Sequence, residues 1–296
     1  HRDLHRLIRR QRQMCIRDRC GRHGDPTPGD LERAQQDKMI RSNLSRISRK
    51  ILVMSGKGGV GKSSVAAYLA LLLSRRGKRV GLLDVDLHGP SIPRLLGLAG
   101  GLEMPEKGVV RPHRFSESLV VVSLEMVLGD KDVAVIWRGP LKISAIRQFI
   151  SDIEWGDLDF LIVDSPPGTG DEPLTVAQNI PDAEALVVTT PQEISLADVR
   201  KSIDFCRQVG MKMLGVVENM SGLVCPHCGE TVSLFGKGGG GRMASRMDLP
   251  FLGEIPMEPA MVRLGDEGRL ESLLEQEDLE VNRAFDRVLD GILQAG

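Results

Sequence analysis

Aromatic residues make up only 3% of the 296 positions, so a hydrophobic core built from this chain must be aliphatic. No apolar run approaches the roughly 20 residues needed to span a bilayer, and the first residues contain no apolar core of a secretory signal. These absences predict a cytoplasmic protein with no membrane partner. The rest of the composition, 27% charged and 41% hydrophobic, is typical of a globular chain long enough for one large α/β domain.

Charge is distributed unevenly along the chain. The first 50 residues carry 14 Lys and Arg against 6 Asp and Glu, whereas the remainder carries 25 against 34. A basic arm can bind nucleic acid or anionic lipid, but the codons for Met14–Arg19 can match a transposase adapter end. We therefore interpret residues 1–24 as a non-native or disordered extension, assign no role to Cys20, and expect no nucleic-acid partner. Residues 25–48 are predicted to be a linker with a short helix, and residues 49–296 the folded domain.

A glycine-rich segment dominates the functional interpretation. Residues 56–64 fit the phosphate-binding pattern G-x-x-x-x-G-K-[ST], between an apolar run and a helical pattern. Glycines let successive N–H groups point at phosphate oxygens, and the following helix places its positive end under the anion. Lys62 is expected at the β- and γ-phosphates and the Ser63 hydroxyl on Mg²⁺. The nucleotide-binding residues are predicted to be Gly56, Lys57, Gly58, Gly59, Val60, Gly61, Lys62, Ser63 and Ser64.

Short apolar runs alternate with helical patterns along the rest of the chain. This pattern predicts an α/β fold with a mostly parallel central sheet covered by helices on both faces. Gly236–Gly241 lacks the strand context and the Lys-Ser ending, so it is predicted to be a mobile loop and not a second phosphate site. Strands are expected at 51–54, 79–83, 119–124, 160–163, 185–189, 213–217 and 251–255, and helices at 65–75, 142–150 and 196–209.

Carboxylates follow two of the predicted strands. The run Phe160–Asp164 is a buried strand ending in a carboxylate, so Asp164 is predicted to help hold Mg²⁺. Asp84 and Asp86 come at the end of another strand, where open α/β sheets bind ligands. Capping of the following turn is the alternative for both Asp84 and Asp86.

Cys225 and Cys228 form a C-x-x-C pair in a chain with only five cysteines. Two thiolates at this spacing can bind one metal edge, and no second C-x-x-C completes a four-thiolate site, so four ligands require two chains. The spacing suits a bridging 4Fe–4S cluster or a tetrahedral zinc equally. A thioredoxin-type disulfide and half of a zinc ribbon are further alternatives, whereas Cys206 is interpreted as a packing residue.

Five motifs occur in one order along the chain: Lys57–Ser63, Asp84–Ser91, Asp164–Asp171, Thr189–Glu193 and Asn219–Cys228. Together they resemble the Mrp/ApbC-type iron–sulfur cluster carrier ATPases, relatives of the MinD and ParA group of P-loop NTPases. The resemblance covers the chain from about Ile47 onward, and it makes residues 49–296 a P-loop ATPase domain that contains the cysteine loop.

The resemblance implies a homodimer that binds and hydrolyses ATP. Lys57 would reach the partner's nucleotide, and Lys57, Lys62 and Asp86 would be catalytic, with Asp86 positioning the attacking water. Asn219 would bind the adenine edge; a strand-end turn residue is the alternative. A 4Fe–4S cluster would bridge Cys225 and Cys228 of both subunits, arrive from a cluster donor and pass to apo iron–sulfur proteins, with slow hydrolysis coupled to loading or release.

Two other functions fit parts of the pattern. A MinD/ParA-like positioning ATPase would need a membrane-binding helix or a DNA-binding surface, and the amphipathic stretch Leu279–Leu293 carries acidic residues that disfavour anionic lipid. A zinc-stabilised dimeric ATPase scaffold without cluster transfer fits the same cysteines.

Overall fold

The computed structural model describes residues 28–86, 89, 91–102, 109–128, 139–225, 228–276 and 278–295. The chain divides into residues 1–36 and 37–296, and the second unit holds the sheet and every site considered below. None of the described helices is both long and apolar enough to cross a membrane. Leu87, His88 and Pro90 of the Asp84–Ser91 motif, the cysteines Cys15 and Cys20, and His227 of the C-x-x-C segment lie outside the described residues.

Continuous apolar runs form the centre of the sheet, as predicted. The strands are β1 (Ile47–Ser55), β2 (Val80–Asp84), β3 (His113–Arg114), β4 (Leu119–Ser123), β5 (Leu158–Asp164), β6 (Ala183–Thr189), β7 (Lys212–Val224), β8 (Thr231–Val232) and β9 (Phe251–Met257). Their order is β3-β4-β2-β5-β1-β6-β7-β8, and β9 pairs with β7. Within the described residues, β3 and β8 pair antiparallel and the other strands pair parallel, which confirms the mostly parallel sheet.

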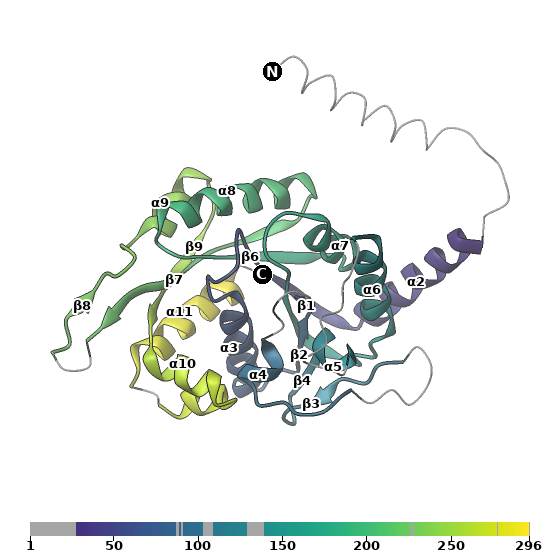
Figure 1. Cartoon of the computed structure of the whole chain (residues 1–296), viewed down its shortest axis with the longest axis horizontal. Helices are drawn as coiled ribbons and strands as arrows, with labels where there is room; N and C mark the ends of the chain where they lie inside the picture. The colour runs from purple at the N-terminus through teal and green to yellow at the C-terminus, as the bar shows by residue number, and fades with distance from the viewer. Residues whose placement is uncertain are drawn as a thin grey trace, which may run out of the picture. The chain divides into compact units, whose positions relative to one another are not determined.

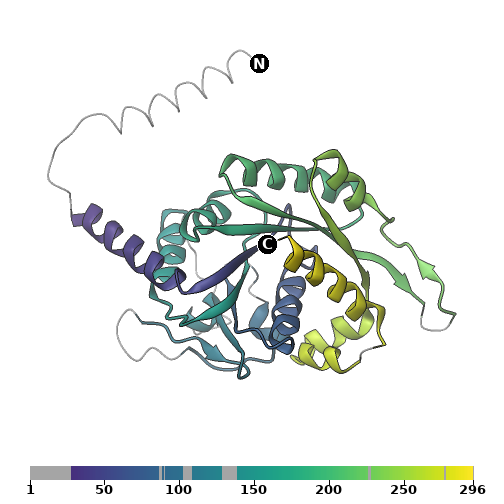
Figure 2. The same cartoon turned by 180° about the vertical axis from the view of Figure 1, so that it is seen from behind.

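Helices cover both faces of this sheet (Figures 1 and 2). They are α2 (Pro28–Leu44), α3 (Lys62–Arg75), α4 (Ile92–Leu95), α5 (Leu124–Leu128), α6 (Gly139–Asp152), α7 (Asp171–Asn179), α8 (Glu193–Gln208), α9 (Gly239–Arg246), α10 (Pro259–Asp266), the 3₁₀ helix η1 (Leu270–Glu275) and α11 (Glu280–Gln294). Alternate residues of β1 enter different cores: Ile51 and Val53 pack on one side, Leu52 and Met54 on the other. This alternation follows from the two-residue period of a strand.

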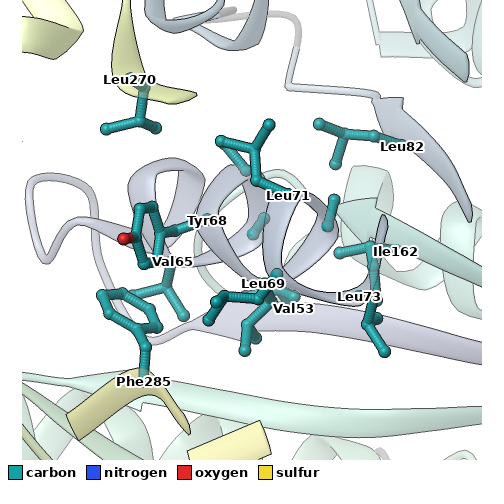
Figure 3. Close-up of a cluster of buried hydrophobic side chains, with 14 of the residues drawn as sticks. Val53, Val65, Tyr68, Leu69, Leu71, Leu73, Leu82, Ile162, Leu270 and Phe285 are labelled. Atoms are coloured by element: carbon teal, nitrogen blue, oxygen red, sulfur yellow. The ribbon is translucent and has the colours of Figure 1, made fainter. Parts of the chain in front are cut away.

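Helix α3 is the centre of one core (Figure 3). Its side chains Val65, Leu69 and Leu73 pack with Val53 of β1 and Ile162 of β5. Tyr68 of the same helix contacts Phe285 of α11, with ring centroids 4.5 Å apart. The Tyr68 hydroxyl donates a hydrogen bond to the buried Asn282 amide oxygen. The aliphatic character expected from the composition therefore holds, with a single aromatic pair at the α3–α11 contact.

A buried carboxylate ties three strands together at their N-terminal ends. Glu184 of β6 lies 2.6 Å from the Arg49 guanidinium of β1 and 2.7 Å from the Lys212 ammonium of β7. Burial alone would raise the pKa of Glu184, but hydrogen bonds from Lys212 and Arg49 outweigh it and lower the pKa below its ordinary value. The ionised carboxylate therefore stabilises the folded state.

Two predictions about the cysteine region are wrong. The strand expected at 213–217 continues to Val224, because β7 pairs with β9 as far as Leu223 and its last two residues pair with β8 to form a ribbon. Gly236–Gly241 is not a mobile loop throughout, since α9 begins at Gly239. Both errors arise from contacts between segments distant in sequence, which local composition does not record.

Candidate functional site

The glycine-rich loop connects β1 to α3 and lines a cavity of about 370 Å³. Gly59 and Gly61 have φ angles of +78° and +79°, a region that disfavours residues with a Cβ atom. These turns direct the backbone around the cavity, whose lining includes residues 57–59 and 61–64 of the loop together with Asp86, Ser91 and Pro167. The conformation is that of an anion cradle at the N-terminus of a helix.

Three charged side chains meet beneath the cradle. The buried Lys62 ammonium lies 2.5 Å from Asp164 Oδ1 and 3.5 Å from Asp86 Oδ2. Burial raises the pKa of Asp164, although the neighbouring Lys62 ammonium and the Ser63 hydroxyl favour its ionised form. The structure thus brings together the lysine and both carboxylates expected from separate motifs, which lie up to 102 residues apart in the chain.

Asp84 caps the turn that follows β2, which is the alternative given for it in the sequence analysis. Its completely buried carboxylate accepts hydrogen bonds from the Asp86 backbone N–H at 3.1 Å and from the Ser123 hydroxyl at 3.1 Å. A longer contact of 3.4 Å reaches the Ile92 N–H at the start of α4. Burial, and then the nearby Asp164 carboxylate, raise the pKa of Asp84 to about 8. Asp84 therefore fixes the backbone that carries Asp86.

The residues present fit a magnesium ion. Asp164 Oδ2 is buried and, among the described residues, has no hydrogen-bond partner. A carboxylate oxygen with unused acceptor capacity next to the Ser63 hydroxyl is an oxygen donor set of the kind that Mg²⁺ takes together with substrate phosphates. The described residues hold no group of three or more His, Cys, Asp or Glu suited to a metal ion, so such a site depends on those phosphates.

The segment after Asp164 contacts the start of the phosphate loop. The Gly168 backbone N–H donates to the Ser55 carbonyl at 2.9 Å, and Gly168 has a φ of +86°. The Ser55 hydroxyl in turn donates to the Lys57 carbonyl at 2.9 Å. Lys57 is half-buried and lines the cradle, so its backbone position is linked to the segment that follows β5.

A second cavity of about 320 Å³ adjoins the cradle and shares Gly61 and Ser64 with it. Its lining is mainly apolar and includes Met220, Met257 and Pro259. Asn219 also lines it, while its side-chain amide donates to the Val60 carbonyl at 2.9 Å. Asn219 lies within β7 and not at the end of a strand, so one of its amide hydrogens already positions the phosphate loop.

Size alone would select a different cavity. A larger one, of about 730 Å³, is lined by residues 48–50, 177–178, 180–184 and 209–212, at the N-terminal ends of β1, β6 and β7. It contains no residue of the phosphate loop. Ligands of parallel α/β sheets bind beyond the C-terminal strand ends, so the cradle remains the candidate nucleotide site.

The two cysteines lie at the tip of a ribbon formed by β7 and β8, which extends beyond the main sheet (Figures 1 and 2). The Gly229 N–H donates to the Cys225 carbonyl at 2.9 Å, and this bond closes the turn between the thiols. Cys225 is half-buried, Cys228 is exposed, and neither is in a disulfide. The pair does not open a helix, as a thioredoxin-type motif would. Exposed apolar side chains accompany the ribbon at Val224, Val232, Leu234 and Phe235.

The base of this ribbon is held by Glu218, which sequence analysis had not assigned to the site. Its buried carboxylate accepts hydrogen bonds from the Ser221 hydroxyl at 2.6 Å and from the Gly238 and Gly240 N–H groups at 2.9 and 2.5 Å. A carboxylate at a helix N-terminus offsets the partial positive charge there. The sequence signal for this role is an acidic residue within a buried strand, next to Asn219. Its hydrogen-bond partners at the start of α9, however, lie some 20 residues further along the chain.

Comparisons with known proteins identify the family of the chain. The ParA family model described as NUBPL iron-transfer P-loop NTPase matches residues 46–293. The iron-sulfur cluster carrier protein of Methanocaldococcus jannaschii is 44% identical over 262 residues, 88% of this chain and 89% of that protein. The cytosolic Fe-S cluster assembly factor NUBP2 of Homo sapiens is 48% identical over 231 residues, 76% of this chain and 85% of that protein.

Solved structures show the same fold. The nucleotide-binding protein of Archaeoglobus fulgidus, in complex with ADP, matches with a TM-score of 0.70 and 41% identity, covering 80% of this chain and 93% of that one. The cell division ATPase MinD of Pyrococcus furiosus matches with a TM-score of 0.59 and 23% identity, over 84% and 100% of the two chains, a likeness of fold alone. With a family model spanning nearly all of the second unit and relatives well above 30% identity, the chain belongs to the NUBPL iron-transfer P-loop NTPases of the ParA group.

Proposed function

We propose that this chain is an ATP-hydrolysing iron–sulfur cluster carrier that holds a 4Fe–4S cluster between two copies of itself and transfers it to apo-proteins. The observation that carries the proposal is the position of Cys225 and Cys228, a half-buried and an exposed cysteine at the tip of a ribbon that projects from the nucleotide domain. Each chain offers two thiolates and a cluster takes four. Binding of the cluster therefore requires a dimer. The names of the similar carrier and assembly proteins support the same function.

ATP would bind with its phosphates in the cradle and its base in the adjoining apolar cavity, where Asn219 offers amide groups to the adenine edge. Lys62, now bonded to Asp164, would move its charge to the phosphates. Ser63 and Asp164 would hold Mg²⁺, which would neutralise part of the phosphate charge. Asp86, held by Asp84, would accept a hydrogen bond from the attacking water and orient it, and Lys57 would reach the partner's nucleotide. Phosphoryl transfer depends mainly on such positioning and charge stabilisation.

The structure suggests a route by which nucleotide and cluster influence each other. Asn219 bonds the phosphate loop at Val60, and the adjacent Glu218 bonds the start of α9, which follows the ribbon. Met220, the next residue, has a φ of +57°, unusual for a residue with a side chain. A shift of the loop on binding or hydrolysis would therefore act on both strands at the ribbon base. Glu218→Gln should retain ADP affinity and lose the nucleotide dependence of cluster release, and release that responds to nucleotide as before would refute this route.

Anaerobic reconstitution with iron and sulfide tests the carrier function. The native chain should gain a broad absorption band near about 400 nm and bind about half a cluster per chain. Cys225→Ala/Cys228→Ala should take up none, whereas Cys206→Ala, which removes a buried thiol, should match the native chain. Tight zinc binding without iron uptake, or equal uptake by the double variant, would refute the cluster site and favour a zinc scaffold.

A further inference from the structure

A groove between α8 and α9 has no part in the function proposed above. Its volume is about 320 Å³, and its apolar floor is formed by Leu196, Met243 and Met247. Arg200 of α8 and Arg242 and Arg246 of α9 line its sides. The two helices lie side by side in both views of the fold (Figures 1 and 2). The groove therefore combines an apolar floor with three guanidinium groups.

Few carboxylates in the described part of the chain lie close enough to neutralise the charges of these arginines. Arg200, Arg242 and Arg246 are exposed, and Arg242 donates a hydrogen bond to the Lys237 carbonyl, at 3.2 Å. Within the described residues, neither Arg200 nor Arg246 has a carboxylate partner. On α11, by contrast, Arg283 and Arg287 each face a carboxylate, at 3.6 and 2.7 Å. The groove lining thus presents three positive charges against the single carboxylate of Glu193.

We propose that this groove binds an acidic peptide segment of a protein partner in cluster transfer, a proposal that rests on the function given above. A guanidinium group binds a carboxylate through two parallel N–H donors. The floor suits apolar side chains placed between the acidic ones, and its two methionines can adapt their shape to different sequences. The peptide chemistry that matches is therefore alternating acidic and aliphatic residues.

A nucleic acid fits this surface less well. Residues 51–296 carry 25 Lys and Arg against 34 Asp and Glu, so the body around the groove repels a polyanion. Glu193 at the groove itself would face the phosphates. A short peptide can place its carboxylates against the three arginines without covering this acidic surface.

The groove adjoins the base of the cysteine ribbon, so a peptide bound there would hold its protein near the cluster. Helix α9 follows β8 through residues 233–238, and the N–H groups at its start are bonded to Glu218 at the ribbon base. A partner anchored on α9 is held next to the ribbon that carries Cys225 and Cys228. Tethering of this kind raises the effective concentration of the partner's own ligands near the cargo. The groove would therefore select partners and speed transfer without touching the cluster.

Fluorescence anisotropy tests the proposal with the full chain. The probe is a labelled peptide of alternating glutamate and leucine, compared with a glutamine–leucine peptide and a labelled DNA duplex. Arg242→Glu/Arg246→Glu should raise the Kd for the acidic peptide at least about tenfold, because two attractive charges become repulsive. Arg242→Gln/Arg246→Gln should show a smaller loss in the same direction. The matched control is Arg111→Glu/Arg114→Glu, the same charge change at two exposed arginines in and just before β3, at the opposite edge of the sheet.

Cluster uptake separates this proposal from the carrier function. All variants should load iron and sulfide as the native chain does, because the groove contains neither cysteine. Native loading with weakened peptide binding in the groove variants alone supports the docking site. Equal binding of the acidic peptide by native and groove variants, tighter binding of the duplex, or equal binding of the glutamine peptide would overturn it.

Discussion

Replacing Gly61 with alanine tests how the phosphate loop is held. An added Cβ at Gly61 would lie 2.2 Å from the Asn219 amide nitrogen, and Gly61 has a φ of +79°. Gly59 has a similar φ of +78°, but nothing lies within 4 Å of an added Cβ there. Gly59→Ala therefore isolates the backbone cost, and Gly61→Ala adds the collision with Asn219.

The expected magnitudes follow from these contacts. A residue with a Cβ in the left-handed region costs about 1–2 kcal/mol. Displacing Asn219 leaves the buried Val60 carbonyl without its donor, which costs about 1–3 kcal/mol more. Gly61→Ala should therefore lower the free energy of unfolding by roughly 2–5 kcal/mol, and Gly59→Ala by about 1–2 kcal/mol.

Urea denaturation of the nucleotide-free chain measures both effects, because bound nucleotide would add its own stabilisation. In an Asn219→Ala background, Gly61→Ala should cost no more than Gly59→Ala, since the colliding amide is gone. Equal costs of Gly59→Ala and Gly61→Ala in the native background would show that Asn219 does not brace the loop.

Three further predictions concern other parts of the molecule. Burial raises the pKa of Cys206 to about 11, so at pH 8 iodoacetamide should modify Cys206 at least about a hundredfold more slowly than an ordinary exposed thiol. Cys225 and Cys228 should react first in peptide mapping, and prompt modification of Cys206 would contradict its burial. Glu184→Gln should lower the free energy of unfolding most above pH 4.5, the ordinary glutamate pKa. The difference from the native chain should shrink as the pH falls through the lowered pKa of the folded state. Thermal melts across this pH range measure the difference, and a difference that did not change with pH would contradict the prediction. Tyr68→Phe should cost about 1–2 kcal/mol in urea, because a buried amide oxygen loses its donor, and an unchanged midpoint would count against that hydrogen bond.

Local patterns in the sequence predicted the central strands and the phosphate loop well. Ile51–Met54 is recognisable because strands buried on both faces are continuously apolar. The start of β1 at Ile47 is less visible, since its polar residues are fixed by pairing with β5. The meeting of Lys62 with Asp164 was predictable, because parallel strands end at one edge of a sheet.

The contacts that hold the ribbon could not be predicted from local sequence patterns. Glu218 caps α9 across 22 residues, and the glycines at the start of that helix have no side-chain periodicity that would indicate a helix. The bond from the Asp86 N–H to Asp84 is local and matches the turn capping that the sequence allowed, but the bond from Ser123 of β4 to Asp84 depends on the neighbouring strand. Such roles are set by strand order, which the apolar pattern alone leaves undetermined.

The scarcity of aromatic residues has a spectroscopic consequence. Tyr68, the only tyrosine, is buried in the core on the α3 side of the sheet, whereas Trp155 is buried in the core on the other side. Second-derivative ultraviolet absorbance, which separates the tyrosine band from that of tryptophan, and fluorescence of Trp155, isolated by replacing Trp137, would therefore report on opposite faces. Coincident transitions of the two chromophores would mean that both layers melt as one cooperative unit.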